Sequence, residues 1–174
     1  YDAVTLGNHE FDNGMDTLAA VLKLVDLPIV NSNYGLENTP IAPFVKPYLI
    51  LHRGGLKIGV FGIGVNLKGL AFQKNYAGLE LRDPLKAATQ TSDFLKNEQK
   101  CDLVICLSHL GTSAEDSSPT DYDLVAASRN IDVVIGGHSH KILENVTANN
   151  AAGKPVIIAQ MGKSGLNLGR IDLM

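Results

Sequence analysis

Three apolar runs in this 174-residue chain each end in a short polar stretch that contains histidine. Residues 3–6 lead into Gly7-Asn8-His9-Glu10-Phe11-Asp12, and the two later stretches are Ser108-His109-Leu110-Gly111 and Gly137-His138-Ser139-His140. Short, nearly continuous apolar runs are typical of buried parallel strands. Open α/β sheets place their ligand sites at the carboxyl ends of such strands. The pattern therefore predicts one site that is assembled from three strand ends.

The apolar spacing between these stretches predicts an alternation of helices and strands. Met15, Leu18 and Leu22 recur at helical spacing, Gly54-Gly55 separates two apolar runs as in a β-hairpin, and Asp83-Pro84 pairs a helix N-cap with proline at the first helical position. The expected elements are helices at 15–25, 84–100 and 122–128, strands at 28–33, 102–107, 131–135, 155–160 and 168–173, a hairpin of 48–53 with 56–62, a polar loop at 112–120 and a hairpin tip at 148–154. This order predicts an α/β fold with a mixed β-sheet core and packed helices, in one domain that spans residues 1–174.

Composition narrows the classes of function. A net charge of -3 provides no basic surface for a nucleic-acid polymer. The sequence also lacks an apolar run near the roughly 20 residues that a membrane span needs. Cys101 and Cys106 flank one strand-like run and fall on opposite faces of it, so we expect two small buried side chains rather than a disulfide.

Both ends of the sequence lie within predicted strands. The chain opens at Tyr1, without an initiator methionine, and residues 170–174 are again strand-like. We therefore expect a piece of a longer chain, for which the lack of a signal peptide carries no information on localisation. A piece that lacks central strands exposes sheet edges. We expect these edges to be covered by the rest of the chain or to associate with another chain.

The three polar stretches together offer metal-binding atoms. If the strand ends converge, they present the side-chain oxygen of Asn8 and the imidazoles of His109, His138 and His140, with His9 and Asp12 beside them. Imidazole nitrogen with oxygen suits Zn, Mn, Fe or Ni better than Ca. The glycines before His138 allow a tight backbone turn. On an extended backbone, His138 and His140 would point the same way and could reach one metal ion or two adjacent ones.

Each of these residues also has a plain structural explanation. A lone histidine after a strand, such as His109, is more often a hydrogen-bonded surface residue, and we treat the isolated His52 as structural. Asn8 could satisfy a turn, Asp12 could cap the following helix, and Glu10 could be a solvated first-turn carboxylate. The joint pattern favours a site, because four of the five histidines fall in the three stretches.

Charge limits what these residues can hold by themselves. The ligand candidates Asn8, His109, His138 and His140 are all neutral, whereas two divalent ions would bring four positive charges together. Such sites normally include carboxylates, and a bridging carboxylate would reduce the repulsion. Asp12 is better placed as a partner for His9. The site is therefore either mononuclear and weak, or its acidic ligands lie outside this sequence.

The three ordered motifs resemble those of the calcineurin-like metallophosphoesterases. Residues 1–6 and Leu168-Gly169-Arg170-Ile171-Asp172 look most like the 5'-nucleotidase branch. The resemblance implies a four-layer α/β/β/α fold that is incomplete here, because the family's upstream Asp-x-His and Gly-Asp motifs are absent, as is the C-terminal domain that binds the nucleoside. Those motifs carry the acidic ligands that the charge argument requires.

The resemblance also implies a role for each residue. Asn8, His109 and His138 would bind one of two divalent ions, Zn or Mn, and His140 would contribute to the other. His9 would sit over the phosphate of the substrate, oriented by Asp12, while Asn8 would also face the substrate. The implied reaction is hydrolysis of nucleoside 5'-phosphates by a metal-activated hydroxide in an exported protein. The alternatives are a hydrolase of cyclic nucleotides, nucleotide-sugars or sulfur esters, or, for this chain alone, an inactive and non-catalytic scaffold.

Overall fold

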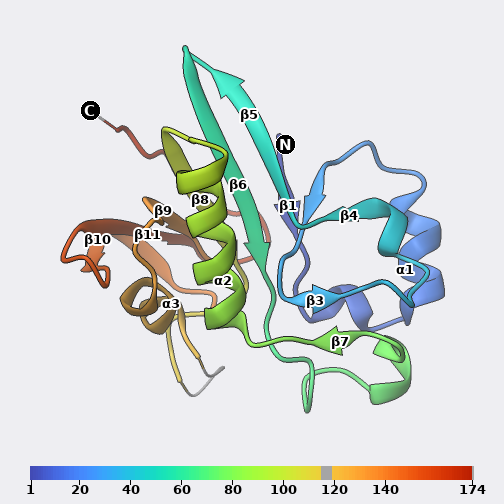
Figure 1. Cartoon of the computed structure of the whole chain (residues 1–174). Helices are drawn as coiled ribbons and strands as arrows, with labels where there is room; N and C mark the ends of the chain where they lie inside the picture. Colours follow the sequence, from blue (N-terminus) through green and yellow to red (C-terminus); the bar gives the residue numbers. More distant parts are fainter. Residues whose placement is uncertain (115–118, 174) are drawn as a thin grey trace.

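A six-stranded mixed sheet forms the larger half of the protein (Figure 1). The computed structural model describes residues 1–114 and 119–173. The strand order is β10-β11-β9-β8-β6-β5, in which the four central strands run parallel and the two outer strands antiparallel. The strands are β5 (Tyr48–Arg53), β6 (Leu56–Ile63), β8 (Leu103–Ser108), β9 (Val133–Ile135), β10 (Ile142–Asn149) and β11 (Pro155–Met161). The predicted mixed sheet and the hairpin β5–β6 are thus confirmed.

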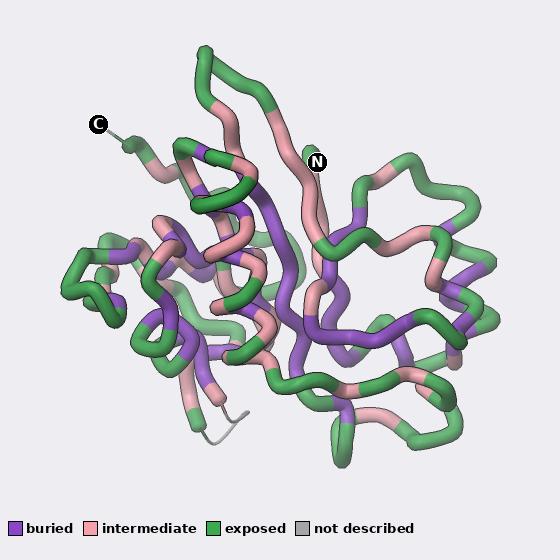
Figure 2. Tube along the Cα trace, in the orientation of Figure 1, coloured by how far each residue is buried: buried purple, intermediate pink, exposed green. Residues whose placement is uncertain are grey.

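Helices α2 (Pro84–Asp93) and α3 (Asp121–Ala127) cover one face of this sheet. As the sequence predicts, the Asp83 carboxylate caps α2 by accepting hydrogen bonds from two backbone N–H groups, and a π-helical turn, Phe94–Glu98, extends the helix. Thr120 caps α3 in a reciprocal capping box with Asp123. The side chains between these helices and the sheet form one of two separate cores. Figure 2 marks the buried residues of the chain in purple.

The smaller half is built around a parallel sheet in the order β1-β2-β4. Its strands are β1 (Val4–Thr5), β2 (Ile29–Val30) and β4 (Val45–Lys46). This half also contains helix α1 (Met15–Leu22) and three 3₁₀ turns, His9–Phe11, Ala42–Phe44 and Gln73–Tyr76. A two-stranded antiparallel ribbon of β3 (Tyr34–Gly35) and β7 (Glu80–Leu81) completes it. Packing of α1 against the first polar stretch and the ribbon forms the second core.

The helical layer and the small sheet lie against opposite faces of β6. A Cβ atom built on Gly59 would face the Leu95 side chain in the helical layer. One built on Gly62, three residues later and therefore on the other face of the strand, would overlap the Val30 carbonyl oxygen and the Thr5 hydroxyl. The order of layers is helices, large sheet, small sheet, helix. This is the expected α/β/β/α arrangement with a small second sheet.

Several expected boundaries differ from those observed. Residues 168–173 form no strand, because no strand of the described residues pairs with them, and Leu168 is almost fully exposed. The first helix ends at Leu22 rather than at residue 25, and β10 continues to Asn149, so the hairpin tip is confined to residues 150–154. The predicted loop at 112–120 lies partly outside the described residues.

Two further expectations concern cysteines and edges. Cys101 and Cys106 are both buried and free, as expected. The strands at the sheet edges are β1 and β4 in the small sheet and β5 and β10 in the large one. Association through these edges stays a prediction. In the described residues, no helix has the length and apolar character that a membrane crossing requires.

Replacement of Gly62 by alanine should destabilise the protein by about 3 kcal/mol, because the added methyl group would displace the backbone carbonyl of Val30 and force the sheets apart. Gly59→Ala is the matched control on the same strand. Its methyl group meets only side-chain atoms, the Cys101 sulfur and the flexible end of Leu95, each at 3.1 Å, and should cost about 1 kcal/mol. Urea unfolding of the two variants measures the difference. Equal losses would contradict the close sheet contact at Gly62.

Candidate metal centre

The three polar stretches converge, as predicted, at one end of the two sheets. The Asn8 side-chain oxygen lies 3.1 Å from Nε2 of His109, although 101 residues separate them in the chain. The His109 ring lies between two glycines: a Cβ atom on Gly7 would be 2.5 Å from Nε2, and one on Gly137 would be 3.1 Å from Nδ1. Larger residues at these two positions would displace the imidazole.

The other histidines surround His109. The His138 ring centre lies 5.2 Å from that of His109 and is tilted by 57°. Burial, and to a smaller extent the charges of His138, His9 and His140, together lower the pKa of His109 to about 4. His109 is therefore neutral near pH 7, which leaves a nitrogen lone pair available to a metal ion.

The backbone that carries His138 and His140 is not extended. Both residues adopt positive φ angles, 66° for His138 and 54° for His140. The expectation that the two side chains point the same way depends on an extended backbone, so it does not apply. Left-handed conformations cost a non-glycine residue on the order of 1 kcal/mol or more, and they persist where the surroundings hold them.

His9 and Asp12 form a pair beside this cluster. His9 Nδ1 and Asp12 Oδ2 are 2.9 Å apart, and both side chains are exposed. The 3₁₀ turn His9–Phe11 brings the two residues onto one side. Asp12 thus contacts Nδ1 and not Nε2 of the His9 ring.

The structural alternatives for Asn8 and Asp12 do not hold, whereas Glu10 does have a structural role. The N-cap position of helix α1 is Gly14, without a side-chain capping hydrogen bond, so Asp12 is not its cap, and the Asn8 side chain makes no capping hydrogen bond either. Glu10 does serve the local structure, because its carboxylate accepts a hydrogen bond of 2.6 Å from Gly7 N–H. The side chains of Asn8 and Asp12 instead contact the imidazoles of His109 and His9.

The donor atoms fit part of a metal site. Among residues 1–114 and 119–173, no group of three His, Cys, Asp or Glu side chains is arranged to hold a metal ion. The Asn8 oxygen and the neutral His109 nitrogen nevertheless face each other at 3.1 Å, which is the mixed oxygen and nitrogen chemistry that Zn or Mn accepts. These two side chains supply neutral donors only, and a metal site at this position stays a prediction.

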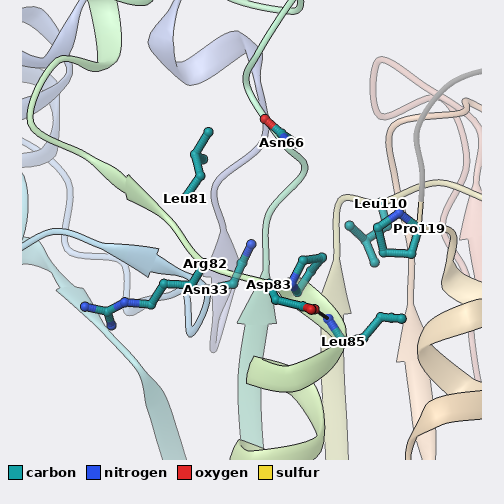
Figure 3. A pocket seen from close by; sticks show the side chains of 9 residues that line it. Asn33, Asn66, Leu81, Arg82, Asp83, Leu85, Leu110 and Pro119 are labelled. Carbon is teal, nitrogen blue, oxygen red and sulfur yellow. Dashed lines mark hydrogen bonds between the residues drawn. The ribbon is translucent and has the colours of Figure 1, made fainter.

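Two cavities lie near these residues without containing the cluster. One of about 370 Å³, shown in Figure 3, is lined by Leu110 and by Asn33, whose amide is already bonded to Gly64. Arg82 also lines this cavity, but its guanidinium points away from the other lining side chains and donates hydrogen bonds to Glu80 and Glu37. The second, of about 430 Å³, is lined by Asp12 and residues 69–72 and therefore opens beside the His9–Asp12 pair.

Sequence reasoning missed two buried polar residues beneath the cluster. Asp121 accepts a 2.5 Å hydrogen bond from the hydroxyl of Ser108, and its second oxygen has no hydrogen-bond partner in the described part of the chain. Gln160 is 1% exposed and bonds to the loop that carries His138. One signal was available, since Gln160 follows Val156 and Ile158 at the alternate spacing of the inward face of a strand.

Burial raises the pKa of Asp121 and the hydrogen bond from the Ser108 hydroxyl lowers it by a smaller amount, so that the pKa is about 7. The folded protein therefore binds more protons than the unfolded chain between about pH 4 and pH 7, so this carboxyl makes stability fall as pH rises through that window. Asp121→Asn should remove the effect. In metal-free protein, the stability of the variant relative to wild type should grow by about 3 kcal/mol from pH 4 to pH 7, measured by urea unfolding.

The raised pKa of Asp121 is tested by comparing Asp121→Asn with wild type and with a control variant. The lowered pKa of His109 makes stability rise with pH between about 4 and 6.5, but it acts equally in both proteins and cancels in the difference. Asp123→Asn is the matched control on the same helix. Hydrogen bonds from Thr120 lower the pKa of Asp123, so this variant should lose stability relative to wild type as pH rises. A pH-independent difference for Asp121→Asn would refute the buried-acid assignment.

Comparison with known proteins gives these residues a family context. Residues 1–142 match the calcineurin-like phosphoesterase family. The chain is 37% identical over 161 residues to an apyrase of Tabanus yao, covering 90% of this chain and 27% of the relative. It is 35% identical to a 2',3'-cyclic-nucleotide 2'-phosphodiesterase/3'-nucleotidase of Haemophilus influenzae, covering 83% and 24% of the two proteins. The chain thus spans about a quarter of the length of these relatives.

Solved structures agree with the fold. A 5'-nucleotidase precursor from Thermus thermophilus superimposes with a TM-score of 0.80 at 26% identity, covering 92% of this chain and 33% of that one. The phosphoesterase YfkN from Bacillus subtilis superimposes with a TM-score of 0.72 at 26% identity, covering 93% of this chain and 54% of that one. The predicted fold class is confirmed. Since the family match extends over most of the sequence, the chain belongs to the calcineurin-like phosphoesterase family.

Proposed function

We propose that this protein is a metal-dependent phosphohydrolase that acts on nucleoside 5'-phosphates. The family generally uses a dinuclear divalent metal centre. The observation that carries the proposal is the position of the His9–Asp12 pair next to the Asn8–His109 contact. Metal binding alone would not require an exposed imidazole that is held in one orientation beside the Asn8–His109 contact. The 5'-nucleotidase names among the relatives support the choice of substrate.

Metal binding in this proposal follows the chemistry of the donors. Asn8, His109 and His138 would hold one ion, and His140 would contribute to the other, with Zn and Mn as the candidates. When bound, such ions polarise phosphoryl oxygens and make a water molecule acidic enough to act as nucleophile near neutral pH. Burial keeps His109 neutral, so it would bind without first losing a proton. Carboxylate ligands would come from residues beyond this sequence.

His9 and Asp12 would serve the phosphate. Asp12 accepts from Nδ1–H of His9 and so fixes the ring orientation, which would leave Nε2 to face a bound phosphoryl group. A protonated His9 would stabilise the negative charge that develops there and could deliver a proton to the leaving oxygen. The cavity beside Asp12 leaves room for that leaving group. These steps require no covalent bond between enzyme and substrate.

A second substrate class has its own support. The 35% identical relative from Haemophilus influenzae is named a 2',3'-cyclic-nucleotide 2'-phosphodiesterase/3'-nucleotidase, so hydrolysis of cyclic nucleotides is the alternative that we retain. Nucleotide-sugars and sulfur esters stay predictions without separate support. Export of the protein also stays a prediction. It is supported by the similar Thermus thermophilus protein, which is described as a 5'-nucleotidase precursor.

His9→Ala should lower kcat for a nucleoside 5'-phosphate by about 100-fold to 10,000-fold, because it removes both charge stabilisation and proton transfer. His52→Ala is the matched control, since His52 lies on the exposed hairpin β5–β6, and it should retain wild-type turnover. The measurement is phosphate release by the full product of the gene, loaded with Mn or Zn. Unchanged turnover in His9→Ala would exclude the assigned role.

Removal of the metal ions should abolish phosphate release and leave the protein folded, because each half has its own apolar core. The test is dialysis against a chelator, followed by activity and circular dichroism measurements and by addition of Mn or Zn to restore turnover. Full activity after chelation would exclude the metal-dependent mechanism. A loaded protein that releases no phosphate from any nucleotide would exclude the proposed function.

A further inference from the structure

One buried amide holds the loop that carries His138 and His140. Gln160 lies on β11 with its side chain 1% exposed, facing the loop of residues 137–141. Its Nε2–H₂ group donates to the Gly137 carbonyl oxygen at 2.8 Å. Its Oε1 atom accepts from Lys141 N–H at 2.6 Å and from the Ser139 hydroxyl at 3.1 Å. One side chain thus bonds to three positions of a five-residue loop.

These three positions alternate with the two histidines. Gln160 contacts residues 137, 139 and 141, whereas the imidazoles project from residues 138 and 140. Both histidines have positive φ angles, 66° and 54°, a conformation that non-glycine residues avoid unless the surroundings impose it. The hydrogen bonds of Gln160 fix the backbone on each side of each strained residue. They therefore determine where the two imidazoles point.

The same amide also connects the two histidine loops to each other. The Ser139 oxygen that contacts Gln160 lies 3.2 Å from the Thr112 backbone nitrogen and 3.1 Å from the Thr112 hydroxyl. Thr112 follows the stretch that contains His109. Any displacement of Ser139 would therefore shift the His138 loop relative to the His109 loop. The distance between candidate ligands on different loops depends on this connection.

A role in simple core packing does not account for Gln160. The preceding inward residues on β11 are Val156 and Ile158, both fully buried and apolar. An apolar residue at position 160 would continue this face, whereas a buried amide costs free energy unless its hydrogen bonds are made. The side chain makes three of them, all to one loop. The polar residue at this position is therefore explained by the loop that it holds.

We propose that Gln160 is a positioning residue for metal binding, and that its amide sets the directions of His138 and His140 so that both can bind divalent ions. The inference deepens the proposed function and rests on the ligand roles proposed there. Residues that orient ligands from behind typically contribute about 10-fold to 100-fold to metal affinity. Gln160 does so through the backbone of the loop rather than through a hydrogen bond to an imidazole.

Gln160→Met tests the inference, because methionine keeps the length and volume of the side chain but makes none of the three hydrogen bonds. The affinity of the full gene product for Zn and Mn, measured by titration in competition with a chelator, should fall by about 10-fold to 100-fold. Ile158→Val is the matched control, two residues earlier on the same buried face of β11. It removes one methylene group from the core and should change metal affinity by less than about 2-fold.

Ser139→Ala provides a second variant that leaves the core intact. It removes only the Gln160 contact to the hydroxyl and the link to Thr112, so its loss of metal affinity should fall between those of Ile158→Val and Gln160→Met. Urea unfolding of the metal-free proteins shows whether each variant is folded. Should Gln160→Met fail to fold, a wild-type affinity in Ser139→Ala would overturn the inference.

The outcomes separate the inference from the proposed function. If Gln160→Met is folded and binds metal as tightly as Ile158→Val, the inference is wrong while phosphohydrolysis stands. If wild type binds Zn or Mn, Gln160→Met binds it more weakly, and wild type releases no phosphate from nucleotides, the inference stands and the proposed function is wrong. A wild-type protein that binds neither ion would overturn both.

Discussion

The contact between the two sheets at Gly62 is the constraint on which the candidate site depends. The two halves of the protein have separate cores, so their relative position is set where β6 lies against β1 and β2. No side chain fits between Gly62 and the Val30 carbonyl, and the Ser32 N–H donates to the Gly62 carbonyl at 2.8 Å. This close approach brings the end of β1 next to the end of β8, where Gly7 in turn leaves space for the His109 ring.

The electrostatics of the cluster depend on what the sheets bury. His109 lies beside three other histidines in a mostly buried position, which makes its protonation unfavourable. A neutral imidazole is a ready ligand, but several neutral ligands cannot compensate the charge of two divalent ions. The Asn8 amide and the histidines would therefore supply the oxygen and nitrogen ligands of a metal centre, and other residues would supply its carboxylates. Asp121 does not fill this role, because its carboxyl is fully buried and one of its oxygens accepts a hydrogen bond from Ser108.

The sequence allowed prediction of features that depend on local chemistry. The Gly54-Gly55 turn and the Asp83-Pro84 cap each specify an element through neighbouring residues, and the structure has both the hairpin and the capped helix. The convergence of the histidine stretches was predictable as well, because carboxyl ends of parallel strands share one edge of a sheet. The expected strand at 168–173 was wrong because pairing depends on a distant partner strand, which alternation within a segment does not specify.

The features that sequence reasoning missed belong to the support of the site rather than to its ligands. The left-handed backbone at His138 and His140 follows from hydrogen bonds to Gln160, which lies 21 residues beyond Ser139 in the chain. No local propensity specifies such a conformation, since both residues would avoid it in isolation. The motif thus determines which atoms are available for a metal ion, whereas their directions are determined by a residue on another strand. A chain that retained the histidines and lost the buried amide would keep the motif without its geometry. Judging whether such a motif can bind metal therefore requires the residues beneath the loop as well as those on it.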